Sequence, residues 1–262
     1  MADLVCNNCG ASLVGPFCHQ CGQREIDEWR SIGAIVRQFW DELVSFDYKS
    51  ARTVLALLRP GYLAAEFIAG RRDRYLSPLK VYFLTAALFF IVAPRVTDFT
   101  FERQMALDPD GRFRAMVAAR LADTHMSPEL FAERFNAKLQ TIYTITPIFS
   151  VLSAALVLRQ LFGRKFPWLG PHTVFALYHV AFMFFVWLLL HGLNQALAGI
   201  DTNILIGLLF AIVVPYMFVA LRRVYGEPSS QTCWKTLAFL AVTFLLDAPI
   251  NAGAMLLSVR LT

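Results

Sequence analysis

The chain has 262 residues, of which 57% are hydrophobic and 16% are charged. Soluble globular domains carry roughly 25% charged residues, so this composition excludes an ordinary soluble domain. The formal net charge of +5 is explained by basic residues near helix ends and does not indicate a nucleic-acid-binding surface. We therefore expect an all-α membrane protein whose apolar residues face lipid as well as a core.

Four cysteines near the amino terminus have the spacing C-x2-C-x8-C-x2-C. They are Cys6, Cys9, Cys18 and Cys21. Each pair is followed by a glycine, Gly10 or Gly22, which permits the tight turn that aims two thiolates at one ion. Two such turns complete a tetrahedral zinc site, and four thiolates leave no position open for a substrate. We therefore predict a zinc ribbon over residues 1–24, with the zinc in a structural role.

An alternative interpretation of these cysteines is a pair of disulfides, or thiols without a shared role. A reducing, cytoplasmic location argues against disulfides. His19 lies inside the second C-x-x-C pair and is expected to face solvent, because four cysteines already complete the site. The segment has little hydrophobic content, so its folding should depend on zinc. Cys233 begins the last apolar run and is expected to be an inert thiol.

Residues 25–77 are expected to form a cytoplasmic amphipathic helical segment. Within it, Ser31–Phe46 repeats apolar residues at i, i+3, i+4 and i+7, which predicts one apolar helical face that is too short to cross a bilayer. This helix could lie on the membrane surface or pack on the bundle, and its weakly basic polar face favours packing against protein. Two further short helices are expected on either side of Pro60-Gly61, the second ending at Gly70.

Basic residues cluster just before and at the start of the first apolar run. They are Arg71, Arg72, Arg74 and Lys80. Their plain interpretation is a topology signal on the cytoplasmic side of the membrane. A sharper interpretation is a contact site for anionic lipid headgroups, which would make membrane lipid a partner.

Several of these motifs together resemble a known family. They are the cysteine pattern CxNCG followed by FCxQCGQ, the turn Leu-Leu-Arg-Pro-Gly, and the run GRRDRYLSP that leads into the first apolar run. The chain resembles bacterial polytopic membrane proteins known only as a domain of unknown function. The resemblance implies a bacterial inner-membrane protein whose amino-terminal ribbon binds zinc through Cys6, Cys9, Cys18 and Cys21. It implies no activity.

Five long apolar runs follow, each near the roughly 20 residues that cross about 30 Å of hydrocarbon. They are Leu79–Val96, Ile142–Phe162, Thr173–Ala198, Ile204–Val224 and Trp234–Val259. We predict about five transmembrane helices within residues 78–262. The first run is the shortest and stops near Pro94.

The loop at 97–141 is expected to form two amphipathic helices over the outer end of the bundle. A turn at 108–111 precedes the first helix, and Ser127-Pro128 caps and starts the second. The expected apolar faces are Phe113, Met116, Val117 and Leu121 in the first helix, and Phe131, Phe135 and Leu139 in the second.

Lys and Arg residues near the ends of the apolar runs predict the orientation. Three basic groups fall on the same side of the membrane, within residues 71–74, 159–165 and 222–235. This side should be the cytoplasm, and we expect insertion by the protein's own helices because no secretory signal peptide is recognisable. The prediction is a multi-pass protein of the bacterial inner membrane with a cytoplasmic amino terminus and a periplasmic carboxyl terminus.

Polar side chains inside the apolar runs are costly and therefore informative. The candidates for an intramembrane polar cluster are His179, His191, Asn194, Asp247 and Asn251. Asp247 falls between the depths of the two histidines, and Asn251 lies one helical turn beyond it on the same face. One interpretation is a proton or cation relay. The other is hydrogen bonding between helices that holds the bundle together.

These patterns favour a membrane-anchored interaction or regulatory scaffold, whose zinc ribbon presents a docking surface to a cytoplasmic protein. An alternative is a small transporter or channel that uses Asp247 and the histidines. A third is a lipid-modifying enzyme with His191 or Asp247 as acid or base. No phosphate-binding loop, nucleophile elbow or catalytic pair of carboxylates indicates an enzyme. The sequence does not indicate an oligomeric state.

Overall fold

The computed structural model describes residues 5–23, 49–96, 100–106, 108–197 and 200–262. Within these residues the chain is nearly all helical, as the composition predicts, and they form no named strand. The predicted amphipathic helix Ser31–Phe46 lies outside the described residues. The helices are α2 (Lys49–Leu57), α3 (Tyr62–Ile68), α4 (Pro78–Val96), α5 (Phe101–Ala106), α6 (Arg112–Thr124), α7 (Pro128–Phe162), α8 (Leu169–Ala196), α9 (Thr202–Tyr225) and α10 (Ser229–Leu261).

Among the described residues, four helices are long and apolar enough to cross a membrane, namely α7, α8, α9 and α10. The first predicted span corresponds to α4, which is also apolar but shorter. The five predicted runs therefore all form helices, and four of them meet the length and composition of a membrane span. This architecture is compatible with a multi-pass membrane protein.

Helix α7 extends well beyond the predicted second span. Its 35 residues join the second amphipathic helix of the 97–141 loop to that span without interruption. The hydroxyl of Ser127 accepts a hydrogen bond from the N–H of Leu130 and caps the start. The chain between Asn136 and Ile142 contains neither glycine nor proline, so the backbone stays helical where the composition changes from polar to apolar.

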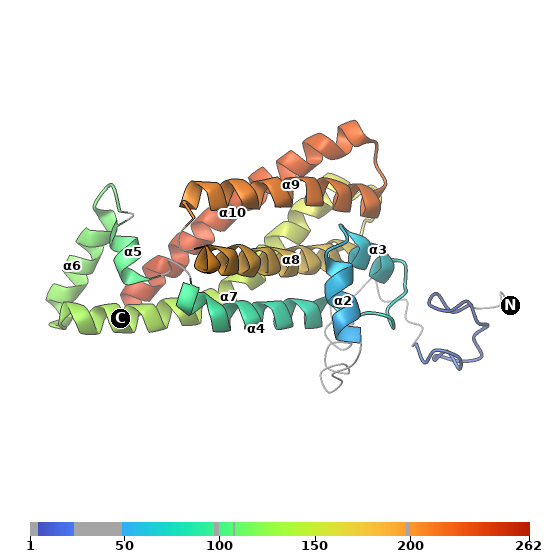
Figure 1. Cartoon of the computed structure of the whole chain (residues 1–262), viewed down its shortest axis with the longest axis horizontal. Coiled ribbons are helices and arrows are strands. Elements are labelled where there is room, and N and C mark those ends of the chain that lie inside the picture. Colours follow the sequence, from blue (N-terminus) through green and yellow to red (C-terminus); the bar gives the residue numbers. More distant parts are fainter. Residues whose placement is uncertain (1–4, 24–48, 97–99, 107, 198–199) are drawn as a thin grey trace.

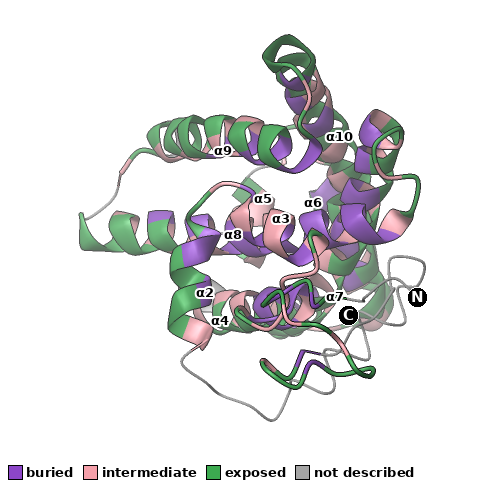
Figure 2. Cartoon of the chain, turned by 90° about the vertical axis from the view of Figure 1, so that its right-hand side faces the viewer, coloured by how far each residue is buried: buried purple, intermediate pink, exposed green. Residues whose placement is uncertain are grey.

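Successive long helices run in opposite directions along the bundle, with α8 at its centre (Figure 1). Helix α8 packs against α4 and α7, and α10 packs against α7 and α9. Small residues at the core of α8, Ala176 and Ala181, are fully buried. The outward surfaces of α9 and α10 are largely exposed, as expected for helices that face lipid (Figure 2).

The bundle has two structurally different ends. The first, which we call the cysteine end, comprises residues 5–23, α2, α3 and the connections α7–α8 and α9–α10 (Figure 1). All three basic groups that were used to predict the orientation lie at this end. The second, which we call the phenylalanine end, comprises α5, α6, the start of α7 and the end of α10.

The phenylalanine end has a hydrophobic core of its own. Its buried residues are Phe113, Val117, Phe131, Phe135, Leu139 and Val259. The first five lie on the two apolar faces predicted from helical periodicity, which are therefore confirmed. Val259 of α10 completes the cluster, so the carboxyl-terminal helix holds this end of the bundle in place.

Candidate metal centre and the platform that supports it

The side chains of the four amino-terminal cysteines converge on one point. The sulfur atoms of Cys6, Cys9, Cys18 and Cys21 all lie within 4.8 Å of one another. The Sγ atoms of Cys6 and Cys21 are 3.7 Å apart, and those of Cys9 and Cys18 are 3.5 Å apart. A tetrahedral zinc ion with Zn–S bonds of about 2.3 Å separates its sulfur ligands by about 3.8 Å. The four free thiols could therefore hold a metal ion.

The backbone forms two equivalent turns around this point. In each turn, the N–H of the glycine after the cysteine pair donates to the carbonyl of the first cysteine, at 2.9 Å. Gly10 has a φ of 80° and Gly22 a φ of 74°, a conformation that glycine adopts without steric cost. The glycines predicted to permit tight turns therefore do so.

The electrostatics differ between the cysteines: the thiolate of Cys18 is favoured, whereas at Cys9 a hydrogen bond from the Ala11 backbone is outweighed by desolvation and the neighbouring thiols, which raise the pKa of Cys9. Hydrogen bonds from the backbone N–H of Cys21, and then of Gln20, lower the pKa of Cys18 to about 6. Because the thiolate is the form that binds metal, this turn favours binding near neutral pH. His19 is exposed to solvent, as predicted.

Gln23 joins the cysteine segment, residues 5–23, to the rest of the protein. Its side-chain Nε2 donates to the carbonyl of Gly70 at 2.7 Å. Its Oε1 accepts from the backbone N–H groups of Arg72 and Asp73, at 3.1 and 3.3 Å. Gln23 is only 8% exposed. One side chain therefore recognises three backbone groups of the turn between α3 and α4.

The first cysteine turn contacts the same turn of the bundle. Gly70 ends α3 with a φ of 84°. A Cβ atom placed on Gly70 would lie 3.0 Å from the Cβ of Asn7, closer than ordinary packing allows. Asn7 lies between Cys6 and Cys9, so each of the two cysteine turns places one residue on this part of the bundle.

The basic residues of this turn mostly pack against the protein. Arg71 forms a bidentate ion pair with Glu66, at 2.7 and 2.6 Å, and this interaction raises the pKa of Arg71. The guanidinium of Arg72 lies 5.0 Å from the centre of the Phe67 ring. Lys80 is buried, whereas Arg74 is exposed. Of the four residues proposed to contact lipid headgroups, Arg74 is the most accessible.

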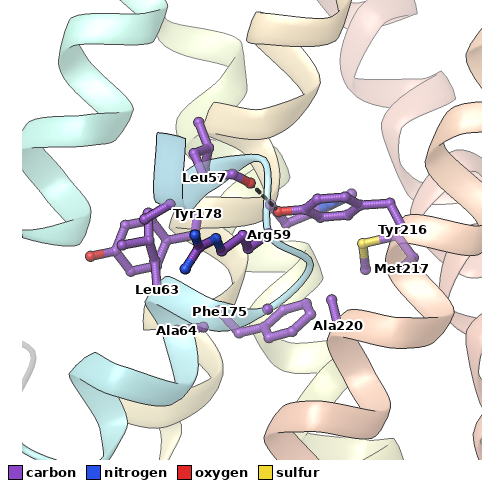
Figure 3. A pocket seen from close by; sticks show the side chains of 12 residues that line it. Leu57, Arg59, Leu63, Ala64, Phe175, Tyr178, Tyr216, Met217 and Ala220 are labelled. Carbon is purple, nitrogen blue, oxygen red and sulfur yellow. Dashed lines mark hydrogen bonds between the residues drawn. The ribbon is translucent and has the colours of Figure 1, made fainter. Parts of the chain in front are cut away.

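Helices α2 and α3 form a platform next to this turn, fixed by side chains from the long helices. The hydroxyl of Tyr216 donates to the carbonyl of Leu57 at 2.7 Å (Figure 3). The guanidinium of Arg223 donates to the carbonyl of Pro60. The backbone at Gly61 has a φ of 65°, and a Cβ there would lie 2.7 Å from the backbone of Ala220. Glycine is therefore required at this position for two independent reasons.

A small cavity lies between the platform, α8 and α9 (Figure 3). Its volume of about 20 Å³ is enough for one water molecule. Arg59, Tyr178, His179 and Tyr216 contribute polar groups to its wall. Among the described residues, the buried Nδ1 of His179 has no hydrogen-bond partner. Asp247 is not part of the wall.

Residues 48–90 match DUF3667, a family of proteins of unknown function. The match covers α2, α3, the Gly70–Asp73 turn and most of α4, and we call these residues the DUF3667 segment. No curated protein and no solved structure matches the chain. Two of the motifs in the sequence resemblance, Leu-Leu-Arg-Pro-Gly and GRRDRYLSP, lie within the matched residues. The four cysteines lie outside the match, on its amino-terminal side.

Backbone carbonyls of the DUF3667 segment receive hydrogen bonds from distant parts of the chain. The four pairs are Leu57 with Tyr216, Pro60 with Arg223, Gly70 with Gln23, and Leu76 with Tyr178. Leu57 ends α2 and the other three carbonyls lie in connections between helices, so side chains from elsewhere satisfy them. The segment therefore connects the cysteine segment to α8 and α9.

His172 holds the cysteine end together in a way that sequence spacing did not reveal. It is fully buried, with Nε2 2.9 Å from the carbonyl of Phe166 and Nδ1 2.8 Å from the hydroxyl of Tyr225. A carbonyl only accepts, so Nε2 donates and Nδ1 accepts the tyrosine proton. The Tyr225 ring also stacks on Phe162, at 4.1 Å between centres. The α7–α8 connection is thereby fastened to the end of α9.

Two of the polar residues predicted inside the membrane lie together. The carboxylate of Asp247 accepts a hydrogen bond from the hydroxyl of Ser150 at 2.9 Å, which links α10 to α7. The side chain of Asn251 donates to the backbone carbonyl of Asp247. Ser150 was not among the predicted residues, because helical depth alone does not indicate which face of a neighbouring helix is opposite.

The remaining members of the predicted polar cluster make other contacts. The ring of His179 lies edge-on to Phe239, at 5.5 Å between centres. The ring of His191 packs on Trp187. The side chain of Asn194 accepts a hydrogen bond from the N–H of Ile200 and so stabilises the α8–α9 connection.

Proposed function

We propose that the protein is a membrane-anchored scaffold in which a zinc-bound cysteine segment recruits a protein partner on the cytoplasmic side. The observation that carries this proposal is the closed set of four sulfur ligands. Four thiolates saturate a tetrahedral ion and leave no site for water or substrate, which favours recognition over catalysis. Membrane lipid would surround the bundle, and Arg74 is an accessible basic residue where headgroups would meet this end.

Two exposed apolar side chains of the cysteine segment support a role in recognition. Val14 is 93% exposed and Phe17 is 59% exposed, and both lie in the loop between the two cysteine turns, residues 11–17, which we call the hairpin. A protein partner that covered both side chains would remove their apolar surface from water, which favours binding. The side chain of Gln23 attaches the cysteine segment to the DUF3667 segment, which limits how the hairpin can move relative to the bundle.

We infer the location of the protein from the grouping of its basic residues. Lys and Arg at the cysteine end favour the cytoplasmic face of a bacterial inner membrane. The amino terminus would then be cytoplasmic, where reducing conditions keep the cysteines as metal ligands. The carboxyl terminus would be periplasmic, with the phenylalanine end covering the periplasmic side of the bundle.

In-cell photocrosslinking tests this proposal. A photoreactive amino acid at position 14 or 17 should capture a discrete protein partner, and Phe17→Ser should abolish the adduct formed from position 14. A matched control is Leu55→Ser, which changes a 67% exposed apolar residue outside the cysteine segment and should leave the adduct intact. Failure to capture any protein through the hairpin would overturn the scaffold proposal.

A second candidate function is a small transporter or channel that uses Asp247. Its support is the Asp247–Ser150 hydrogen bond between two helices that each contain an internal proline, Pro147 in α7 and Pro249 in α10. Prolines free backbone carbonyls that transporters use at broken helices. Asp247→Asn should then abolish ion flux in proteoliposomes, while Asp201→Asn, at an exposed position, should not. Equal flux in wild type and Asp247→Asn would exclude this role.

A further inference from the structure

The cysteine segment has no apolar core that could fold it without metal. Its buried residues, among those described, are Cys6, Asn8, Cys18 and Gln23. Two are metal ligands in the proposed site, and the other two are polar. A unit of this kind depends on its metal for a fixed conformation, because burial of apolar surface cannot offset the entropy of ordering the chain.

Gln23 belongs to both the metal site and the docking contact. Its backbone carbonyl accepts the N–H of Cys18 at 2.8 Å and so completes the second cysteine turn. Its side chain makes the three hydrogen bonds to Gly70, Arg72 and Asp73. The turn that contains Cys18 and Cys21 therefore also fixes the backbone of Gln23, and with it the direction of the Gln23 side chain.

The turn that receives Gln23 is itself well ordered by the bundle. Arg71 is held by Glu66, and Asp73 forms an ion pair with Lys49 at the start of α2, at 3.0 Å. One carbonyl and two N–H groups of this turn are arranged to match a single carboxamide, which offers one donor and one acceptor atom. The turn therefore provides a preformed receptor site, and the metal-organised segment provides its ligand.

We propose that metal binding operates a latch: the metal-loaded cysteine segment docks through Gln23 on the Gly70–Asp73 turn, and loss of metal releases it. Release exposes the backbone of the turn and frees the hairpin with Val14 and Phe17 from its fixed orientation. The inference rests on the metal site of the proposed function but does not require a protein partner. The availability of metal would thus control whether the Gly70–Asp73 turn is covered and whether the hairpin is held in one orientation.

Hydrogen exchange measured by mass spectrometry on the full chain in detergent tests the latch. In zinc-loaded protein, the amides of Arg72 and Asp73 should be protected by their bonds to Gln23. Chelation of zinc should accelerate their exchange by at least about tenfold, the effect of losing one to two hydrogen bonds. Circular dichroism should show unchanged helix content, because the bundle does not contain the metal.

Gln23→Ala separates docking from metal binding. This variant should keep one zinc per chain and keep the protection of residues 6–22, yet lose the protection of Arg72 and Asp73 with or without chelator. Gln20→Ala is the matched control, since Gln20 is an exposed glutamine of the same segment. It should behave as wild type.

The outcomes distinguish the two proposals. Wild-type protein purified without zinc, and unable to bind added zinc, would overturn the metal site and the latch together. Protein that holds one zinc but keeps its protection at Arg72 and Asp73 after chelation would overturn the latch alone. Protection at these amides that survives in Gln23→Ala would do the same.

Discussion

The two ends of the bundle combine hydrogen bonds and aromatic packing differently. At the cysteine end, distant side chains donate to backbone carbonyls, as Gln23 does to Gly70 and Tyr216 does to Leu57. At the phenylalanine end, aromatic rings pack face to edge, as Phe101 and Phe113 do around Phe135. Hydrogen bonds are directional and can be made or broken singly, whereas the removal of one ring from a close-packed aromatic core affects every ring packed against it.

This contrast indicates where a change of state can occur. A contact that depends on three hydrogen bonds from one side chain can be released without disturbing the rest of the fold. The phenylalanine end also has a hydrogen bond between distant residues, from the guanidinium of Arg120 to the carbonyl of Arg260 at 3.1 Å, but it has in addition a core in which Phe131 and Phe135 are fully buried. We infer that the cysteine end is the adaptable part of the molecule and the phenylalanine end a fixed closure.

The largest expected effect comes from removing a metal ligand. Cys18→Ser should lower the bound zinc from one per chain to none, because apparent binding free energies of about 10–16 kcal/mol for structural zinc depend on the complete ligand set. The cysteine segment should become accessible to protease while the helical bundle keeps its melting temperature. Elemental analysis and limited proteolysis measure the two effects.

Cys233→Ser is the matched control for this variant, since Cys233 is an exposed cysteine remote from the cluster in sequence. It should retain full zinc content. A lowered melting temperature of the helical bundle in Cys18→Ser would show that the bundle depends on the cysteine segment for its stability.

The next largest effect is expected at the phenylalanine end. Phe135→Ala removes a ring that contacts Phe101 and Phe113, both at 5.6 Å between centres, and should cost about 3–5 kcal/mol of local stability. Hydrogen exchange should accelerate across α5 and α6, with zinc content and the protection of the cysteine segment unchanged. Leu130→Ala, at a 40% exposed position of the same helix, should have little effect. A loss of zinc in Phe135→Ala would show that the two ends are coupled.

Local patterns in the sequence predict much of both ends, while contacts across the chain do not follow from it. Cysteine spacing predicts the four-sulfur cluster, and helical periodicity predicts the faces with Phe113 and Phe131. The partners of Gln23 lie 47 to 50 residues away, so no local rule connects them, although Gln23 and the turn both belong to the motifs that carried the resemblance. The Tyr225 hydroxyl that donates to His172 likewise lies 53 residues away along the chain.

Helix α7 is one continuous helix, whereas the sequence predicts a loop helix and a separate span that begins at Ile142. The change from polar to apolar composition near Ile142 predicts a boundary between a loop helix and a span. Helical hydrogen bonds depend on the backbone and not on the polarity of the side chains, so the helix continues through that point. Polarity therefore indicates where a helix enters a membrane, whereas capping residues such as Ser127 indicate where it begins.

A smaller effect is expected from a single hydroxyl of the platform. Tyr216→Phe leaves the carbonyl of Leu57 without its donor and should destabilise the platform by about 1–3 kcal/mol. Hydrogen exchange in α2 and α3 should increase, while the phenylalanine end should not change. Tyr82→Phe is the matched control, because within the described residues the Tyr82 hydroxyl makes no hydrogen bond. If both variants exchange alike, the hydroxyl of Tyr216 does not hold the platform.

The smallest expected effect is a pH dependence at the phenylalanine end. The backbone N–H of Arg114 donates to the carboxylate of Asp108 at 2.9 Å, which lowers the pKa of Asp108 below its usual 3.8 and caps the first turn of α6. A lowered pKa means that the folded state prefers the carboxylate, so its contribution to stability is present above pH 3.8 and is lost as the pH falls through the lowered pKa. Hydrogen exchange at the start of α6, corrected for intrinsic rates, should therefore increase on acidification. Asp108→Asn should weaken that dependence and Asp110→Asn should retain it, while equal pH profiles in all three proteins would show that the cap does not titrate.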